Sequence, residues 1–317
     1  MGQVYSDFDT LPKNAGMMTG IQEIDNATNG FQPGTVAGVC AFTSHGKSLA
    51  CLSMAYKNVK LGKKGLLMSL EVHPSIIWMQ LYARYLFEEH NVEINSQELI
   101  NRTLTEEKER SIKQYEEGFK EMMKNFIIWD ESKISKKVMM SDKLLRKVIK
   151  KAETKLGGLD FVIWDHVTQF DLMYDGDDVG NKCIKTIQMV TKTYKNQSDL
   201  PLVTIMAVQV NRKGKEKADK QEGRYSLNAI SDNNEVERTC SYCMFLYTNE
   251  DMRMNQETKV TLMKNRLGQL VVEPVVTTFN PIVVVVGDLI SKVEYQDDFS
   301  DFSSGGFDDF GADDSFD

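Results

Sequence analysis

The sequence predicts an α/β fold, in which a central, mostly parallel sheet carries helices on both faces and continues into an antiparallel extension. First, continuous apolar runs alternate with helical segments, which is typical of βαβ units around a buried parallel sheet. Second, a run that fits a phosphate-binding loop joins the first strand of this alternation to the first long helix. Third, the last four apolar runs follow one another closely, which indicates an antiparallel extension.

The individual elements follow from the periodicity of the apolar residues. The expected parallel strands are residues 35–40, 64–70, 126–130, 159–165 and 201–209, and the extension comprises 240–247, 259–263, 270–279 and 282–286. The expected helices are residues 20–30, 48–56, 74–89, 142–156 and 180–196, with 96–125 a charged, helix-prone and solvated elaboration. In helix 74–89, Trp78, Tyr82, Tyr85 and Leu86 recur at i, i+4, i+7 and i+8, which predicts a face turned to the core.

The run from Ala41 to Ser48 fits the pattern G-x-x-x-x-G-K-[ST], with Ala41 in place of the first glycine. Chance produces about 0.02 such matches in a chain of this length. A strand that feeds a tight loop and a helix directs several backbone N–H groups and the positive end of the helix dipole at one spot. Lys47 is then placed to reach the β- and γ-phosphates, and Ser48 to ligate Mg²⁺. The expected nucleotide contacts of the loop are Ser44, His45, Gly46, Lys47, Ser48 and Leu49, with His45 a spacer.

Polar residues at the ends of other strands supply the remaining chemistry of nucleotide hydrolysis. This reaction needs a carboxylate for the metal, a group that activates water, and a cation that stabilises the negative charge developing on the γ-phosphate oxygens. Asp165 ends an apolar strand, as a Walker B aspartate does, and is expected to hold Mg²⁺ with Ser48; Asp130 is a weaker alternative. Glu71 ends a neighbouring strand at the carboxyl edge, where we expect it to orient the attacking water. Gln209 ends another strand and is a candidate sensor of the γ-phosphate.

The composition indicates in which cellular compartment the protein is expected to act. The chain has 317 residues, no apolar run near the roughly 20 residues that span a bilayer, and an amino terminus unlike a signal peptide. Five cysteines, an odd number, indicate reduced thiols in a cytoplasm (a host cytoplasm if the protein is viral). Cys240 and Cys243 form a lone C-x-x-C in an apolar strand, which favours two core residues over a zinc site.

Seven motifs occur in order along the chain: Gly20-Ile-x-x-Ile-Asp, Gly30-Phe-Gln-Pro-Gly34, Ala41–Ser48, Ser69-Leu-Glu71, Val208-Gln-Val-Asn-Arg212, Met244-Phe-Leu-Tyr247 and Lys264-Asn-Arg266-Leu-Gly268. Together they resemble the motor domain of DnaB-type hexameric replicative helicases and their phage relatives, a branch of the RecA-like P-loop NTPases. The resemblance implies a homo-hexameric ring with ATP and Mg²⁺ at the subunit interfaces and single-stranded DNA in the channel. It also implies that Lys264 and Arg266 bind the γ-phosphate held by the neighbouring subunit. One departure is His166, which stands where the bacterial enzymes usually have tyrosine.

The best candidate for DNA contact is the stretch 211–224, which follows the Gln209 strand and is expected to be a mobile loop. It contains three acidic and six basic residues, the latter being Arg212, Lys213, Lys215, Lys217, Lys220 and Arg224. Repeated around a ring, these cations would form a positive collar suited to phosphate contacts.

The expected domain organisation is an N-terminal arm (1–16), a RecA-like motor (17–293) and an acidic tail (294–317). Residues 297–317 hold eight Asp and no Lys or Arg, so the 46 acidic residues minus eight leave 38, equal to the 38 basic ones. The net charge of −8 therefore lies in the tail, which is expected to be disordered. Because the tail also carries five Phe, we expect it to recruit a replication partner, such as primase, polymerase, loader or single-stranded-DNA-binding protein.

Taken together, these patterns predict an ATP-driven helicase that translocates on single-stranded DNA and unwinds duplex DNA at a replication fork. Two alternatives keep the ATPase and drop the unwinding. One is a RecA-like recombinase or filament-forming DNA-binding protein, and the other is a KaiC-like regulatory ATPase with a protein partner.

Overall fold

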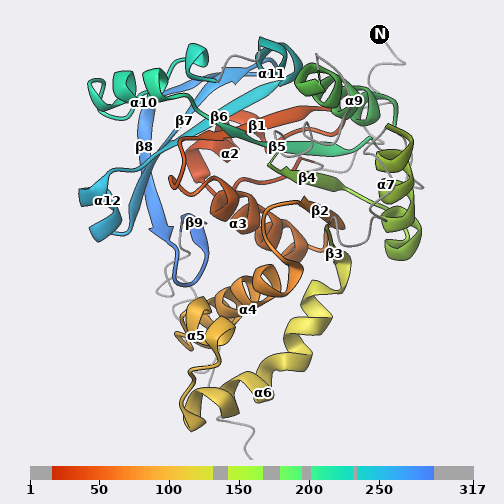
Figure 1. Cartoon of the computed structure of the whole chain (residues 1–317), viewed down its shortest axis with the longest axis vertical. Helices are drawn as coiled ribbons and strands as arrows, with labels where there is room; N and C mark the ends of the chain where they lie inside the picture. Colours follow the sequence, from red (N-terminus) through yellow and green to blue (C-terminus); the bar gives the residue numbers. More distant parts are fainter. Residues whose placement is uncertain (1–15, 131–141, 167–178, 195–200, 231–233, 289–317) are drawn as a thin grey trace, which may run out of the picture.

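The computed structural model describes residues 16–130, 142–166, 179–194, 201–230 and 234–288. Within these ranges the strands form one sheet in the order β3-β2-β4-β5-β1-β6-β7-β8-β9 (Figure 1). The strands are β1 Val36–Ala41, β2 Gly65–Ser69, β3 Phe126–Trp129, β4 Phe161–Asp165, β5 Val203–Gln209, β6 Tyr242–Tyr247, β7 Glu257–Asn265, β8 Val271–Asn280 and β9 Val285–Gly287. Apart from Gly16, the predicted arm and tail lie outside the described residues, and so does the predicted boundary between the motor and the tail at residue 293.

The sheet is mostly parallel, as predicted, and β1 lies near its centre. β5 and β6 flank β1 in parallel, and β2 and β4 continue the parallel part toward β3. The assignment of residues 240–247 to the antiparallel extension was wrong, because β6 runs parallel to β1 and the extension begins only at β7. The reason is that the chain between β5 and β6 forms helices α10 (Arg212–Asp219) and α11 (Asn234–Thr239), which provide a crossover connection.

Helices cover both faces of the parallel part of the sheet, so β1, β2, β4 and β6 are buried on two sides, whereas β8 is mostly half-exposed. On one face, α2 (Gln22–Thr28), α3 (Lys47–Lys60) and α4 (Pro74–His90) pack on alternate residues of the strands. On the other, α7 (Asp142–Leu156) and α9 (Val179–Thr193) pack together with α10 and α11. Because both faces are buried, the strands read as continuous apolar runs in the sequence.

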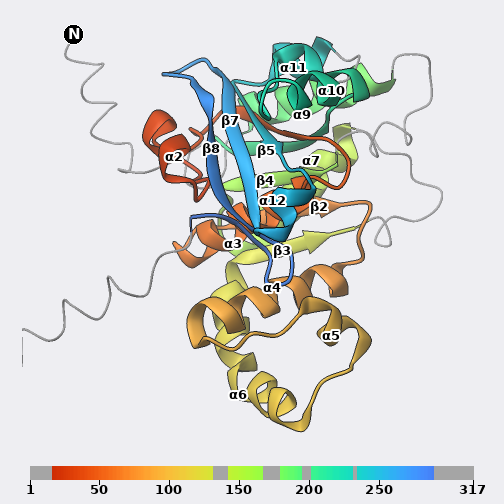
Figure 2. The same ribbon diagram turned by 90° about the vertical axis from the view of Figure 1, so that its left-hand side faces the viewer.

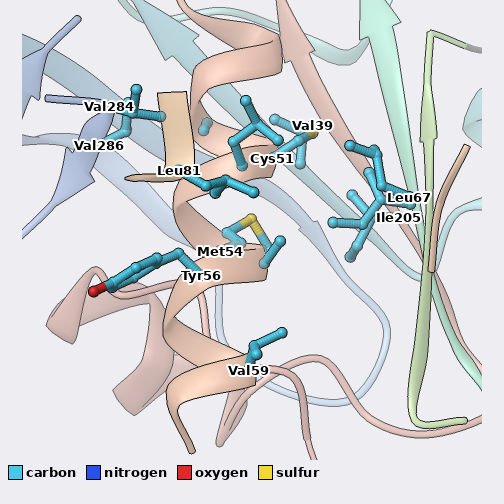
Figure 3. Close-up of a cluster of buried hydrophobic side chains, with 14 of the residues drawn as sticks. Val39, Cys51, Met54, Tyr56, Val59, Leu67, Leu81, Ile205, Val284 and Val286 are labelled. Atoms are coloured by element: carbon cyan, nitrogen blue, oxygen red, sulfur yellow. The ribbon is translucent and has the colours of Figure 1, made fainter. Parts of the chain in front are cut away.

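Helix α3, which follows the candidate phosphate loop, is among the most deeply buried helices (Figure 3). Its residues Cys51 and Met54 pack among Val39 of β1, Leu67 of β2 and Ile205 of β5. On its other side, β9 lies against the helix, and Ser53 Oγ donates to the carbonyl of Val286 at 2.7 Å. The start of α3 is therefore held in place by the core.

Helices α4, α5 (Ser96–Asn101) and α6 (Glu106–Met122) project from one end of the sheet (Figures 1 and 2). The predicted core face of α4 is confirmed: Tyr82, Tyr85 and Leu86 are buried and Trp78 packs against them. The ring of Phe119, the buried residue of α6, lies 4.7 Å from Tyr82 between centroids. Ile112, Tyr115 and Met122 pack partly buried against the same core, and the charged residues of α6 lie on its exposed side. Among the described residues, the structure contains no helix whose length and apolarity would suit a bilayer.

The two cysteines of the C-x-x-C motif are buried, as expected for core residues. Cys243 lies in β6 and Cys240 precedes that strand, and both belong to the same apolar cluster as Cys40 of β1. All three are free thiols.

Candidate nucleotide-binding site

The loop after β1 has the backbone shape of an anion-binding site. His45 N–H donates to the carbonyl of Phe42 at 3.0 Å, and Ser44 and Gly46 adopt left-handed conformations with φ 64° and 82°. α3 begins at Lys47, and its first helical hydrogen bond runs from Ala50 N–H to Gly46 O at 2.8 Å. The N–H groups of residues 46–49 therefore have no acceptor within the helix. With the helix dipole behind them, they form a site for phosphate oxygens.

Ser48 and Asp165 meet at the end of this loop, as the sequence predicted. Ser48 Oγ donates a 3.0 Å hydrogen bond to Asp165 Oδ1, which β4 carries to the edge of the sheet. Asp165 is buried, and burial raises its pKa, with the Glu71 charge adding to the rise and the Ser48 bond and Lys47 opposing it. Mg²⁺ fits this pair, since hydroxyl and carboxylate oxygens are its preferred ligands and a buried carboxylate is stabilised by a cation.

Asp130, the alternative metal ligand, lies at the wrong place in the sheet. It follows β3, and β2 separates β3 from β4. Neighbouring strands are about 4.8 Å apart, so its backbone lies about 10 Å from the strand that ends in Asp165. Asp165, by contrast, contacts the loop through its hydrogen bond with Ser48.

Glu71 lies beside this pair but faces solvent. Ser69 of β2 pairs with Asp165 of β4, and Leu70 N–H donates to the Asp165 carbonyl at 3.2 Å. Two residues on, the side chain of Glu71 is 54% exposed, with Oε2 3.6 Å from His166 Nε2. Burial and the nearby Lys47 lower the pKa of His166, so the imidazole is neutral near pH 7 and does not neutralise the carboxylate. The position suits a residue that orients water, and that role stays a prediction.

Gln209 reaches the loop from the neighbouring strand. It pairs with Ala41, and its Nε2 donates to Thr43 Oγ1 at 2.9 Å. This places the predicted γ-phosphate sensor within the loop's own hydrogen-bond network. Thr43 was not a candidate residue, and only the fold reveals this contact.

The side chain of His45 points into the protein. It is 5% exposed, lies edge-on to the rings of Phe42 and Tyr247, and accepts a 3.3 Å hydrogen bond from Thr248 N–H at Nδ1. The imidazole therefore anchors the loop to the end of β6. Contact between nucleotide and the backbone of His45 stays a prediction.

Replacing His45 by Gln is expected to change how stability depends on pH. Burial first, then Lys215 and Arg253, lower the pKa of His45 from 6.5 to about 4. Below pH 6.5 the unfolded chain binds a proton that the folded protein excludes, so this contribution is present above 6.5 and is lost as pH falls toward 4. Between pH 7.5 and 4.5, wild type should lose on the order of 2 kcal/mol more unfolding free energy than His45→Gln in urea titrations. His73→Gln, at the exposed start of α4, should keep the wild-type slope; equal slopes for all three proteins would contradict the assignment.

Lys264 and Arg266 lie near the amino end of β1, whereas the phosphate loop follows its carboxyl end. Arg266 N–H donates to Ser241 O at 3.0 Å, and Ser241 N–H donates to Val36 O, at the first residue of β1, at 2.7 Å. The loop follows the last residue of β1, about 17 Å away at about 3.3 Å per residue. An arginine side chain does not span that distance. In this chain Arg266 Nη2 donates to Arg238 O at 2.5 Å and Lys264 Nζ to Glu237 O, both at the end of α11.

The basic stretch 211–224 was expected to be a loop, and this was wrong for its first half, which is helix α10. Asn211 caps the helix by accepting a 2.7 Å hydrogen bond from Gly214 N–H, and Gly214 packs on Ala229 too closely for a side chain. The six cations divide into two groups. Lys215 pairs with Asp219 at 2.7 Å, and Arg224 pairs with Glu273. The exposed cations are Arg212, Lys213, Lys217 and Lys220.

The fold and the site together have the architecture of the P-loop class: a phosphate-loop motif after a central parallel strand, with a serine and a strand-end aspartate joined beside it. A family model described as the DnaB-like helicase C terminal domain matches residues 16–282, and the chain belongs to this family. This membership favours the helicase interpretation over the recombinase and the regulatory ATPase.

Solved structures agree with this fold. A structure titled as a DnaB-like replicative helicase and its interactions with primase is 17% identical, with a TM-score of 0.69 over 91% of this chain and 65% of that one. The present chain thus spans just under two thirds of that protein's length. A second solved structure, described as an ATPase domain, is 18% identical, with a TM-score of 0.68 over 91% of this chain and 96% of that domain. Comparison with curated protein sequences finds no match.

Proposed function

We propose that this chain is an ATP-driven motor that translocates on single-stranded DNA and unwinds duplex DNA at a replication fork. The observation that carries the proposal is that, in this member of the DnaB-like helicase family, the proposed catalytic residues lie in two groups at opposite ends of the parallel strands. Lys47, Ser48 and Asp165 gather at one edge of the sheet, and the Lys264 and Arg266 pair lies at the other. Such a chain completes its site only when two copies meet head to tail.

The half-site at the phosphate loop binds MgATP and prepares the water. The N–H groups of residues 46–49 and the Lys47 ammonium hold the phosphates, and Ser48 and Asp165 hold Mg²⁺, which supplies charge neutralisation at the β- and γ-phosphates. Glu71, solvent-facing and beside Asp165, orients the attacking water and accepts its proton. Gln209, bonded to Thr43 in the free loop, responds to the γ-phosphate.

The second half-site comes from the next subunit of a homo-hexameric ring. Head-to-tail contacts that close on themselves make a ring, and each interface then places one subunit's Lys264 and Arg266 at its neighbour's loop. An arginine finger supplied in this way contributes about 10³–10⁵ in rate. Arg266 is held at Arg238 O in the isolated chain and must leave this acceptor to act.

The channel of the ring binds single-stranded DNA through α10. α10 begins three residues after Gln209, so a change at the γ-phosphate sensor acts on this helix over a short path. Lys213 and Lys217 are four residues apart and share one exposed face. Residues 294–317 recruit a replication partner such as primase, polymerase, loader or single-stranded-DNA-binding protein, and the protein acts in the cytoplasm, or in a host cytoplasm if it is viral.

The proposal is tested with a forked DNA substrate, ATP and Mg²⁺. We expect DNA-stimulated ATP hydrolysis and strand displacement, with ring-shaped particles in electron micrographs. Strand exchange on filaments without displacement would instead identify a recombinase, and ATP hydrolysis indifferent to DNA would identify a regulatory ATPase.

The double variant Lys213→Glu/Lys217→Glu is expected to weaken binding to single-stranded DNA at least about tenfold at about 0.1 M salt, with a shallower dependence on salt, since fewer counterions are released. Unstimulated ATP hydrolysis should persist. The matched control, Arg110→Glu/Lys113→Glu, reverses two exposed charges on α6 and should bind DNA as wild type does. Equal losses in both variants would show that only the net charge matters and that α10 is not the contact.

A further inference from the structure

The phosphate loop is braced by residues that lie far from it in sequence. Beyond Gln209 at Thr43 and Thr248 at His45, the ring of Phe279 from β8 lies against Gly46, so closely that an added Cβ would collide with it. Three of the four braces, including the one at Ser44 described next, come from the segment between the end of β6 and β8. This segment therefore bears directly on the nucleotide site.

The brace at Ser44 is an arginine. Helix α12 (Glu250–Met254) follows β6, and Asn249 caps it by accepting a 2.8 Å hydrogen bond from Met252 N–H. From this helix, Arg253 Nη2 donates a 2.6 Å hydrogen bond to the carbonyl oxygen of Ser44. A guanidinium donor makes this contact charge-assisted and stronger than a neutral hydrogen bond.

The contact falls where the loop backbone is least favourable. Ser44 has φ 64°, a left-handed conformation that costs a non-glycine residue on the order of 1 kcal/mol. Gly46 and Lys47, two and three residues further on, begin the row of N–H groups proposed to bind the phosphates. Holding the Ser44 carbonyl toward α12 fixes the direction of this turn, and so preorganises the donors that follow it.

Arg253 also adds positive charge to the loop. After burial, its charge and that of Lys215 are what lower the pKa of His45, so both cations act on this loop in the folded chain. Arg253 is exposed and can follow an incoming anion while remaining anchored on α12. Within the subunit that carries the loop, Arg253 is therefore a second cation near it, besides Lys47.

We propose that Arg253 is a positioning residue of the nucleotide site: it holds the phosphate loop through the Ser44 carbonyl and thereby sets the affinity for the nucleoside triphosphate. This inference rests on the proposed ATPase function. It assigns to α12 a role in binding and none in the transfer of the γ-phosphate.

The experiment compares the wild-type chain with Arg253→Ala, Arg253→Lys and Met254→Ala. Met254 is the adjacent residue of α12, is 76% exposed, and serves as the matched control for disturbance of the helix. The probes are a fluorescent, non-hydrolysable ATP analogue with Mg²⁺ for the dissociation constant, and steady-state ATP hydrolysis for KM and kcat. Urea midpoints check that the variants are folded equally well.

Arg253→Ala is expected to raise both the dissociation constant and KM about tenfold while kcat changes less than about twofold, since a charge-assisted contact to the loop is lost. Arg253→Lys should fall between Arg253→Ala and wild type, and Met254→Ala should match wild type. Unchanged binding by Arg253→Ala, an equal loss in Met254→Ala, or a fall in kcat at constant KM would each overturn the inference. If wild type itself does not bind the analogue, the proposed function fails as well, so the two failures are distinguishable.

Discussion

Lys47→Ala is expected to reduce ATP turnover at least about a thousandfold, to the background of the assay. Lys47 opens α3 and is the residue that we propose to contact the β- and γ-phosphates, so its loss should remove both ground-state binding and the charge that stabilises the transferring phosphoryl group. A thousandfold loss corresponds to about 4 kcal/mol of transition-state stabilisation. The measurement is steady-state release of phosphate with saturating MgATP, with and without single-stranded DNA.

The matched control for this variant is Lys113→Ala. Lys113 is an exposed lysine on α6, which projects away from the sheet (Figure 2). The Lys113→Ala protein should hydrolyse ATP at the wild-type rate, and both variants should unfold at the same urea concentration as the wild-type protein. Retained hydrolysis by a folded Lys47→Ala chain would remove the phosphate loop from the mechanism, and with it the whole assignment of the cis site.

Arg266→Ala is expected to leave nucleotide affinity within about threefold of wild type and to reduce kcat by about 10³–10⁵. The reason is geometric: the backbone of Arg266 bonds to Ser241, which bonds to the first residue of β1, whereas the loop follows the last residue of β1. A residue that cannot reach its own chain's nucleotide affects turnover only from the neighbouring subunit. Arg110→Ala, an exposed arginine on α6, is the matched control and should show wild-type kinetics.

Mixing experiments separate action in trans from action in cis. If one defective subunit disables a ring of six, an equal mixture of Arg266→Ala and wild type retains about 2% of wild-type activity, whereas independent subunits retain about half. The mixture is prepared without nucleotide, so that subunits exchange, and is then assayed with ATP and DNA. Activity that falls in simple proportion to the mutant fraction would place the function of Arg266 within one subunit.

Most of the fold could be predicted from the sequence, because its signals are local. The apolar runs of β1, β2, β4 and β5 mark strands buried on both faces, and the helix 142–156 was located at the observed bounds of α7. Few backbone conformations let the G-K-S sequence connect a preceding strand to a following helix. For the same reason, the contact between Ser48 and Asp165 was anticipated although 117 positions separate the two residues.

Two features could not be predicted from local signals: the parallel pairing of β6 with β1, and the helical conformation of α10. An apolar run has the same composition whether its neighbour is parallel or antiparallel, so the direction of β6 depends on the crossover that precedes it. α10 is rich in lysine and poor in apolar residues. Two of its small residues, Gly214 and Ala218, supply the buried side that lets a charged segment pack as a helix.

By itself, the sequence determined that this chain belongs to the P-loop class of α/β folds and that a serine and a strand-end aspartate lie beside the loop, because those features depend on residue type and spacing along the chain. Only the tertiary structure decided which distant residues hold the loop, since Arg253, Thr248 and Phe279 carry no motif and reach it through the folding of β6, α12 and β8. It also decided that Arg266 faces away from its own loop. Direction and distance across a sheet are properties of strand pairing, and pairing is settled by packing among residues far apart in the chain.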